Sequence, residues 1–328
     1  MHFHLTEEQK AIQEAVRGTL ADSWPIERIH AFADGDADFD RASWDALMAL
    51  GLGGILLPDS GMGLLDAALA CEVAGEAAAA GPLIGQLLAV AAAAASGRAN
   101  LDALASGEAV ATLVHGGSAF VPCARAADIF LVVDRAAGVR LVPAGDGVTI
   151  EAVRASDRTR PVSKVAFAEG AGAMLFAAAD PITARLADAA LVLCAADALG
   201  GAQKVTDMSV AYAKEREQFG QPVGRFQALK HQLAHMALDV EPARALVWYA
   251  AYAWDAELPD APRAAAMAKA HLCDVYVRAT RAAVAAHGGI GYTWEYGLNY
   301  WFRRALFDRA WLGSPSEHRA RAADLASW

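Results

Sequence analysis

The sequence predicts an α+β protein, mostly helical, in which helical segments flank a short block of strands. Apolar residues recur at helical spacing at both ends of the chain, whereas short β-branched runs separated by Gly, Asp and Ala turns lie between them. The length of 328 residues, 55% of them hydrophobic, is enough to bury a core and to form two or three domains. We expect a helical N-terminal domain over residues 1–107, a reduced β-sheet domain over 108–180 and a C-terminal antiparallel helix bundle over 181–328.

The first block begins with a helix whose two ends are both indicated by local sequence signals. Thr6 is a candidate N-cap with Gln9 three residues later, and Trp24-Pro25 ends the helix that follows, because proline disfavours helical backbone in the preceding residue. Two later segments are apolar on most sides, so we expect them to be buried or packed on another chain. The further helices predicted in this block are Ser43–Leu50, Leu64–Ala79 and Ile84–Ala95.

The second block changes period from helical to strand-like. Its runs are short, rich in β-branched residues and bounded by turn residues, which is typical of a small antiparallel sheet or barrel. The predicted strands are Val110–Val114, Ile129–Val133, Val139–Val142, Val148–Val153, Val162–Phe167 and Met174–Phe176.

The third block returns to long helical patterns. The first of them is either one helix or two that bend near Gly200-Gly201, and the prolines after the second mark its end. Long helices joined by short connections predict a bundle. The predicted helices are Ile182–Lys214, Phe226–Ala256, Arg263–Ala286, Tyr300–Arg309 and Ser316–Ala326.

Composition excludes several classes of protein. With 28 Lys and Arg against 38 Asp and Glu, the formal net charge is −10, which argues against a nucleic-acid-binding surface. No uncharged apolar run is long enough to span a bilayer, and the N-terminus has no basic head followed by an apolar segment. We therefore expect a cytoplasmic protein.

A metal site is not expected. The four cysteines have no metal-binding spacing and lie in apolar surroundings, so we interpret them as reduced core residues; they are Cys71, Cys123, Cys194 and Cys273. His231, His235 and Asp239 recur at helical spacing, which can hold a metal ion. A solvated helix face is the simpler interpretation of that stripe.

Known chemical motifs are scarce. The segment Gly288-Gly289-Ile290-Gly291 interrupts a helical pattern and does not follow a strand, so by itself it predicts a helix end and turn rather than a Rossmann fingerprint. The sequence contains no GxSxG, Walker or HExxH motif. Composition and periodicity alone therefore leave the function open.

Two segments resemble the acyl-CoA dehydrogenase family. The first runs from Arg216 to Gln227 and reads REQFGQPVGRFQ; the second, HGGIGYTWEY over residues 287–296, has Arg303-Arg304-Ala305 behind it. The segment Leu5–Val16 and the Leu-Gly-Leu-Gly-Gly-Ile run that begins at Leu50 are similar to earlier landmarks of the family. The resemblance covers the whole chain, and it implies the same helical, strand, helical order.

The resemblance implies FAD as cofactor, held across a subunit interface. Arg216 then suits the anionic pyrophosphate, because a guanidinium is planar and always charged. Phe219 would pack on the flavin or its linker, Gln227 would offer its amide to the adenosine, and Gly288 and Gly289 would let backbone approach the nucleotide. Since the family's set reaches into a neighbouring subunit's flavin, a cofactor role implies a partner.

The departures from the family concern the chemistry. Its members remove an α-proton with a glutamate while a β-hydride goes to the flavin, and the two positions that carry this glutamate in different members are Leu312 and Ala190 here. Neither side chain can take a proton, so we expect no catalytic residue in this chain. The family's Thr-Glu-Pro and Trp-Ile-Thr flavin stretches are missing between Ala111–Val121 and the strand at Ile129, and Ala285 stands where the family often has Gln.

These departures suggest that this chain and a partner subunit contribute different parts of one active site. The chain looks like the short, non-catalytic subunit of the α2β2 heterotetrameric acyl-CoA dehydrogenases that act on steroid side-chain CoA thioesters. A longer subunit would supply the glutamate and bind most of the acyl-CoA. Two alternatives remain: a self-sufficient homo-oligomeric dehydrogenase with a relocated base, or a non-enzymatic structural or regulatory homologue.

Three other carboxylates are candidates for a relocated base. Asp197 lies about two helical turns beyond Ala190, and Glu317 starts the last predicted helix. Glu295 follows the glycine turn, where we expect it to form an ion pair with Arg303 or Arg304 rather than to act as a base.

Overall fold

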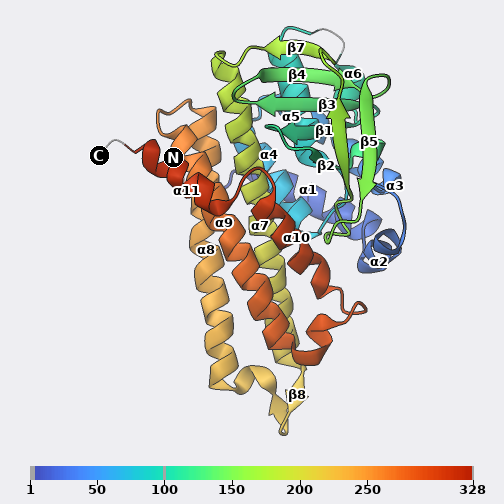
Figure 1. Cartoon of the computed structure of the whole chain (residues 1–328). Coiled ribbons are helices and arrows are strands. Elements are labelled where there is room, and N and C mark those ends of the chain that lie inside the picture. The colour runs from blue at the N-terminus through green and yellow to red at the C-terminus, as the bar shows by residue number, and fades with distance from the viewer. Residues whose placement is uncertain (1–3, 99–100, 327–328) are drawn as a thin grey trace.

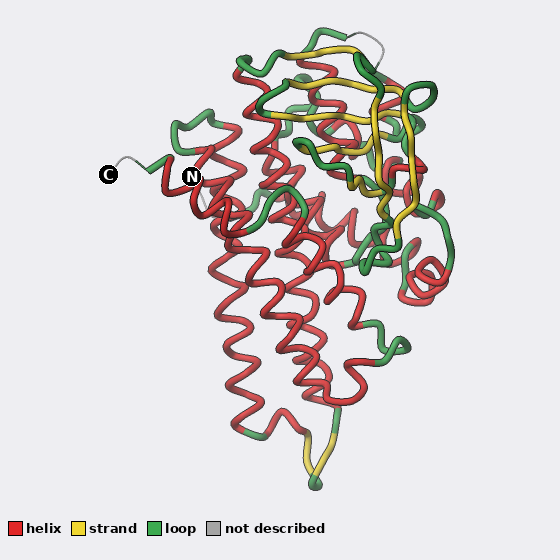
Figure 2. The backbone as a smooth tube through the Cα atoms, in the orientation of Figure 1, coloured by secondary structure: helices red, strands yellow, loops and turns green. Residues whose placement is uncertain are grey.

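The computed structural model describes residues 4–98 and 101–326. Three long helices run side by side, and the strands gather at one end of them against the N-terminal helices (Figure 1). An isolated two-stranded hairpin lies at the opposite end (Figure 2). None of the described helices combines the length and apolarity that a membrane span requires.

The N-terminal block confirms the predicted helices and adds three short ones, α2, η1 and α6. Thr6 caps the first helix in a capping box with Gln9, and that helix ends at Ser23 before Trp24. The helix Ile26–Asp34 was not predicted, because only Ile29, Phe32 and Ala33 mark its buried face. The helices are α1 Glu7–Ser23, α2 Ile26–Asp34, α3 Arg41–Met48, η1 Leu52–Gly54, α4 Leu64–Glu76, α5 Leu83–Ala95 and α6 Asp102–Ala105.

The middle block forms two sheets with a small apolar core of their own, which includes Val121, Phe130 and Val165. The strand orders are β1-β3-β4-β7 and β2-β6-β5, and α5 packs on β1 and β3. The bounds are β1 Ala111–His115, β2 Phe120–Pro122, η2 Ala124–Ala126, β3 Ile129–Asp134, β4 Gly138–Pro143, β5 Val148–Val153, β6 Val162–Phe167 and β7 Ala173–Phe176.

The prediction of a purely antiparallel sheet was wrong at one pair. Strands β1 and β3 are parallel, with Ala111 opposite Ile129, whereas the other pairs within the two sheets are antiparallel. After β1 the chain crosses to the second sheet, forms the three-residue strand β2 and then returns to lie beside β1 in the same direction. A parallel pair requires such a crossover, and β2 is too short to be recognised by its pattern.

The third block is the helix bundle. Helix α7 is one continuous helix of 35 residues and is not interrupted at Gly200-Gly201. A side chain at Gly200 would collide with the backbone of Glu72 in α4, so this glycine serves the close crossing of α4 and α7. The bounds are α7 Pro181–Glu215, β8 Glu217–Gln218, β9 Gln221–Pro222, η3 Val223–Arg225, α8 Gln227–Asp255, α9 Ala261–His287, η4 Gly288–Tyr292, α10 Leu298–Ala310 and α11 Pro315–Asp324.

A buried ion cluster joins the three blocks. It consists of Arg160 from the loop after β5, Asp197 from α7, and Arg304 and Asp308 from α10, all with side chains at most 6% exposed. Arg160 contacts Asp197 at 2.7 Å and also pairs with Asp308, while Arg304 contacts Asp197 at 2.5 Å. Arg304 also donates to the carbonyl of Ala79, which ties in the N-terminal block. Burial opposes ionisation of Asp197, but the two guanidinium groups hold the pKa of its carboxyl below the usual range.

We predict that Arg304→Met lowers the free energy of unfolding by about 3–5 kcal/mol, because it leaves Asp197 buried with one cation fewer. Urea unfolding measures this change. The matched control is Arg309→Gln on the same helix, whose pair with Asp274 is half exposed and is worth about 1 kcal/mol or less. Equal losses in the two variants would contradict a special role for the cluster.

Candidate functional site

The sequence-predicted cofactor residues lie at the end of the bundle remote from the sheets. Arg216 is the C-cap of α7, Phe219 lies at the tip of the β8–β9 hairpin, and Gln227 is the first residue of α8. The hairpin protrudes below the long helices (Figure 1). All three side chains are exposed, so they are available to a group outside this chain.

The hairpin tip holds an aromatic residue in strained backbone. Phe219 has φ of 55° and is 90% exposed, and Gly220 follows with φ of 76°. Positive φ at both central residues is the geometry of a tight two-residue hairpin, but a bulky L-residue adopts it at a cost. Among the described residues, the Phe219 ring has one aromatic neighbour, Phe226. The two rings meet edge to face, with their centroids 6.0 Å apart. Strain at an exposed aromatic side chain is typical of a functional position.

An aromatic cluster positions the glycine turn beside the end of α7. The ring of His287, which precedes Gly288, lies 4.5 Å from that of Tyr212 in the last turns of α7. His287 Nε2 also lies 2.9 Å from the hydroxyl of Tyr296. The two sequence segments are therefore linked through Tyr212, a residue that the sequence analysis did not single out because nothing in its local pattern marks it.

The exposed residues at this end fit an anionic dinucleotide such as FAD. No carboxylate of the described residues pairs with the side chain of Arg216, so its charge is available to a phosphate. A Cβ added at Gly289 would meet no atom of the described chain within 4 Å, so packing within the chain does not require this glycine. Ala285 is exposed and offers no amide.

Ala190 and Leu312, the two positions that the resemblance assigns to the family's glutamate, lie in apolar surroundings. Ala190 is fully buried in α7. Leu312 is buried in the turn between α10 and α11 with φ of 64°, and its carbonyl lies 2.8 Å from His318 Nε2. An apolar cleft of about 400 Å³ opens beside Leu312, and its lining contains no Asp or Glu among the described residues. This arrangement offers no proton acceptor of the family's kind.

The three carboxylates considered as a relocated base are Asp197, Glu317 and Glu295. The first two have structural partners in the chain. Asp197 belongs to the buried ion cluster, and Glu317 accepts from the backbone N–H of Ser314 at 2.6 Å as part of a capping box. The predicted ion pair of Glu295 was wrong: Arg304 pairs with Asp197, while Arg303 donates to the carbonyl of Ser156 and stacks over Trp294. Arg304 points to the interior because α10 packs against α7.

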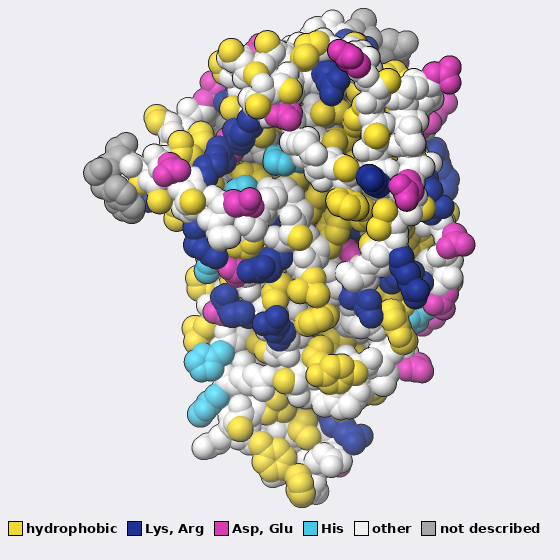
Figure 3. Space-filling view, in the orientation of Figure 1, with side chains coloured by type: hydrophobic (Ala, Val, Ile, Leu, Met, Phe, Trp, Pro, Cys, Tyr) yellow, Lys and Arg dark blue, Asp and Glu magenta, His cyan; other side chains and the backbone are white. Residues whose placement is uncertain are grey.

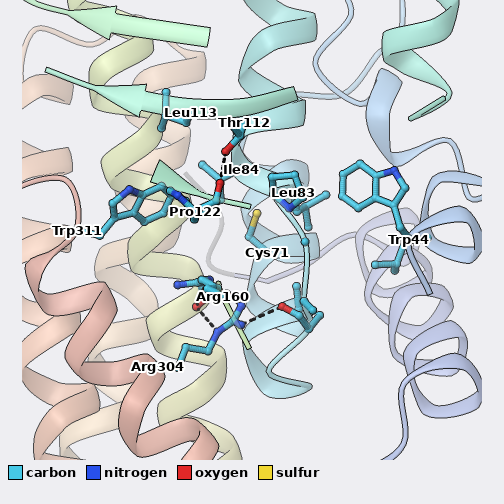
Figure 4. Close-up of a pocket in the computed structure, with 18 residues that line it drawn as sticks. Trp44, Cys71, Leu83, Ile84, Thr112, Leu113, Pro122, Arg160, Arg304 and Trp311 are labelled. Carbon is cyan, nitrogen blue, oxygen red and sulfur yellow. Dashed lines mark hydrogen bonds and ion pairs between the residues drawn. The ribbon is translucent and has the colours of Figure 1, made fainter. Parts of the chain in front are cut away.

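The interior next to the ion cluster has no room for an acyl chain. Figure 4 shows a cavity above Arg160 and Arg304, between Trp311 on one side and Trp44 on the other. Its volume is about 30 Å³, which is enough for one water molecule. Arg160 also lies over the ring of Trp311, 5.8 Å from its centroid, which holds this indole between the small cavity and the apolar cleft.

The histidine stripe on α8 and the four cysteines do not form a metal site among the described residues. His231 and His235 are exposed on α8, and Asp239 pairs with Arg278 at 3.0 Å. Within the described ranges no three His, Cys, Asp or Glu side chains lie close enough to hold a metal ion. The four cysteines are free and buried, as predicted.

Comparison with known proteins establishes the family. Models described as acyl-CoA dehydrogenase N-terminal domain and C-terminal domain match residues 6–113 and 182–324. The chain is 32% identical to "Acyl-CoA dehydrogenase IpdE2" of Mycolicibacterium smegmatis over 97% of this chain and 98% of that relative. The chain belongs to the acyl-CoA dehydrogenase family. It is also 30% identical to the protein of the same name from Mycobacterium tuberculosis, over 95% of each chain.

Solved structures agree with this membership. A chain of the "Tcur3481-Tcur3483 steroid ACAD G363A variant" superimposes with a TM-score of 0.88 at 26% identity, over 97% of both chains. A chain of the ChsE4-ChsE5 complex from Mycobacterium tuberculosis shares the fold with a TM-score of 0.85 at 23% identity, over 99% of this chain and 98% of that chain. The α+β, mostly helical fold of acyl-CoA dehydrogenases is thereby confirmed.

We predict that Phe219→Asn raises the free energy of unfolding by about 1 kcal/mol relative to Phe219→Ala, because asparagine tolerates left-handed backbone. Both variants remove the ring, so their difference isolates the backbone strain. Urea unfolding of the two variants provides the comparison. Equal stabilities would show that the tip carries no strain.

A second prediction concerns His115, which lines the cleft at the end of β1. Burial, together with the positive charge of Arg135, lowers the pKa of His115 to about 4. The stabilisation is therefore complete above the unfolded-state pKa of about 6.5 and is lost as the pH falls toward 4. His115 should thus reduce the free energy of unfolding by about 2 kcal/mol between pH 7 and pH 5.

Urea unfolding at these two pH values should give a smaller difference for His115→Gln than for the native chain. Replacement of the exposed His231 by Gln is the control and should leave the difference unchanged. The same pH dependence in all three proteins would contradict the prediction.

Proposed function

We propose that this chain is one subunit of a flavin-dependent acyl-CoA dehydrogenase, in which it contributes FAD contacts across an interface while a longer partner supplies the catalytic glutamate. The observation that carries the proposal is a contrast between the two ends of the molecule. The residues that the resemblance assigns to FAD are exposed, whereas Leu312 and Ala190, which it assigns to the positions of the glutamate, are buried in apolar surroundings. By itself this chain would be inactive.

Each retained residue has a role toward FAD in this proposal. The guanidinium of Arg216 would hold the pyrophosphate, and the ring of Phe219 would cover apolar surface of the flavin or its linker. The amide of Gln227 would bind the adenosine, and Gly288 and Gly289 would admit the nucleotide next to backbone. When bound, FAD supplies the hydride acceptor of the dehydrogenation.

The relatives support a heteromeric enzyme with a steroid-derived substrate. One similar structure is named as a steroid enzyme with two components, Tcur3481 and Tcur3483, and another as a complex of ChsE4 and ChsE5. The first name supports a steroid-derived substrate, and we propose an α2β2 assembly that acts on a steroid CoA thioester, with the acyl-CoA bound mainly by the partner. Such an assembly would use the hairpin end of this bundle to complete the partner's flavin site.

The test compares this chain alone with the chain co-expressed with a longer family member that has an intact glutamate. We expect flavin absorbance and dehydrogenation of an acyl-CoA only in the co-purified heteromer, whose mass reports the assembly. Stoichiometric flavin and activity in this chain alone would overturn the proposal in favour of a self-sufficient enzyme. A heteromer without flavin would favour a structural role.

Within that heteromer, Arg216→Ala should weaken FAD binding about tenfold or more, because a charge-assisted hydrogen bond to phosphate is lost. The matched control is Lys214→Ala, an exposed cation in the last turn of the same helix. Flavin titration after removal of the cofactor measures both affinities. An equal effect of the two substitutions would indicate a general charge effect rather than a contact.

A further inference from the structure

We propose that a cavity between the N-terminal helices and the bundle is a ligand site of this subunit, and that it takes a carboxylate anion with a small apolar ring as its body. The cavity lies where α1, α2 and α4 meet α7 and α10, and its volume is about 260 Å³. This volume is close to the lower end of the range of ligand pockets. The described lining of this cavity has no residue in common with that of the cleft beside Leu312.

The walls of the cavity are apolar and include two aromatic rings. The indoles of Trp24 and Trp301 line it together with the buried aliphatic side chains of Leu20, Ile29 and Val73. Side chains that border empty space lack dispersion contacts on that side, so a hydrocarbon body that fills the space is favourable. Because aromatic rings pack well against one another, the two indoles favour a flat ring as that body.

One buried donor in the wall lacks a hydrogen-bond partner. The indole N–H of Trp301 donates to the carbonyls of Gly75 and Glu76, at 3.3 and 3.1 Å. The indole N–H of Trp24 is also buried, but it has no acceptor among the described residues. Since an unpaired buried donor carries a free-energy cost, a ligand oxygen that accepts from Trp24 would recover a hydrogen bond.

A lysine without an ion pair supplies the charge. The ammonium group of Lys204 lies over the ring of Trp301, 5.9 Å from its centroid, and no carboxylate of the described chain pairs with it. The other two charged side chains in the described lining neutralise each other, because Arg17 donates to both carboxylate oxygens of Glu76, at 3.0 and 3.2 Å. The lining that the structure describes therefore carries one net positive charge, which a carboxylate would match.

The charged residues mark where the carboxylate would lie. Arg17, Glu76 and Lys204 also line an adjoining cavity of about 460 Å³, which contains Asp207. The ligand would therefore place its ring in the apolar cavity and its carboxylate at the boundary between the two cavities. A second acidic group on the ligand would approach Asp207, whose like charge favours a monocarboxylate over a dicarboxylate.

Binding at this site would be local rather than a general attraction of anions. The formal net charge of the chain is −10, which repels anions at a distance. Lys and Arg side chains nevertheless gather on the face over α9 and α10 (Figure 3). A control cation outside the cavity therefore accompanies the test.

This inference goes beyond the proposed function and does not depend on it. The residues assigned to FAD do not line the cavity, and this chain forms it without flavin or a partner. Failure of the ligand test would leave the flavin test of the heteromer unaffected, and the reverse also holds.

The experiment measures binding of 2-naphthoate and 2-naphthamide to the full-length chain by equilibrium dialysis at neutral pH. The two probes share a ring system and a carbonyl oxygen, but the first alone is charged. We expect naphthoate to bind about tenfold more tightly, because a hydrogen bond between charged groups is stronger than a neutral one. Lys204→Met should remove this difference by weakening naphthoate alone, whereas Trp24→Phe, which removes the indole N–H, should weaken both probes.

The matched control is Lys214→Met, which removes an exposed cation from the last turn of the same helix and should leave both affinities unchanged. Equal affinities of the two probes for the native chain would overturn the role of Lys204. Equal losses of naphthoate affinity in the two lysine variants would do the same, because they would indicate a general charge effect.

A filled cavity provides the second measurement. Ala21→Trp places a large side chain in the cavity and should abolish binding of both probes, whereas Ala15→Trp, at an exposed position of α1 outside the cavity, should leave it unchanged. Melting temperatures of all variants establish that they are folded. Retained binding in Ala21→Trp would place the probes elsewhere, and competition of FAD with naphthoate in the chain alone would identify a flavin surface; either result overturns the proposal.

Discussion

The pairing of Arg160 with Asp197 and Asp308 is the interaction on which the rest of the structure depends. Charges taken out of water must be matched by charges of opposite sign, so these residues fix the loop after β5, helix α7 and helix α10 relative to one another. The same guanidinium lies over Phe307 and Trp311, which places the aromatic wall of the apolar cleft. The side chains of the cluster thus occupy the interior between the loop after β5 and helices α7 and α10.

The molecule separates two kinds of surface. At one end an apolar cleft lies between the sheets and the bundle, and at the other end exposed polar and aromatic groups surround a strained hairpin. Among the described residues that line the cleft, His115 is the one ionisable side chain, and its pKa is lowered to about 4, so the imidazole stays neutral at neutral pH. At the hairpin end, no carboxylate among the described residues forms an ion pair with Arg216. In the proposed heteromer, a partner subunit would supply the groups that each end lacks.

Much of the helical architecture could be predicted from the sequence, because helix periodicity and caps such as Thr6 are local signals. The parallel pairing of β1 with β3 could not, since it depends on a crossover through a strand of three residues. The ion cluster was also missed, because Arg160 and Asp308 are far apart in the chain and charged residues are ordinarily expected at the surface. Family motifs singled out Arg216, whose role toward FAD stays a prediction, whereas no local pattern marks His115.

Helix α7 spans the distance between the two ends without a break. Its 35 residues correspond to a rod about 50 Å long. Insertion or deletion of one residue would turn everything beyond it by about 100° and so swing Arg216 and the hairpin to another face of the bundle. The number of residues in this helix therefore sets both the distance and the direction of the hairpin relative to the ion cluster. In related sequences we expect gaps to accumulate in the loops of the sheet block and to be absent between Asp197 and Arg216.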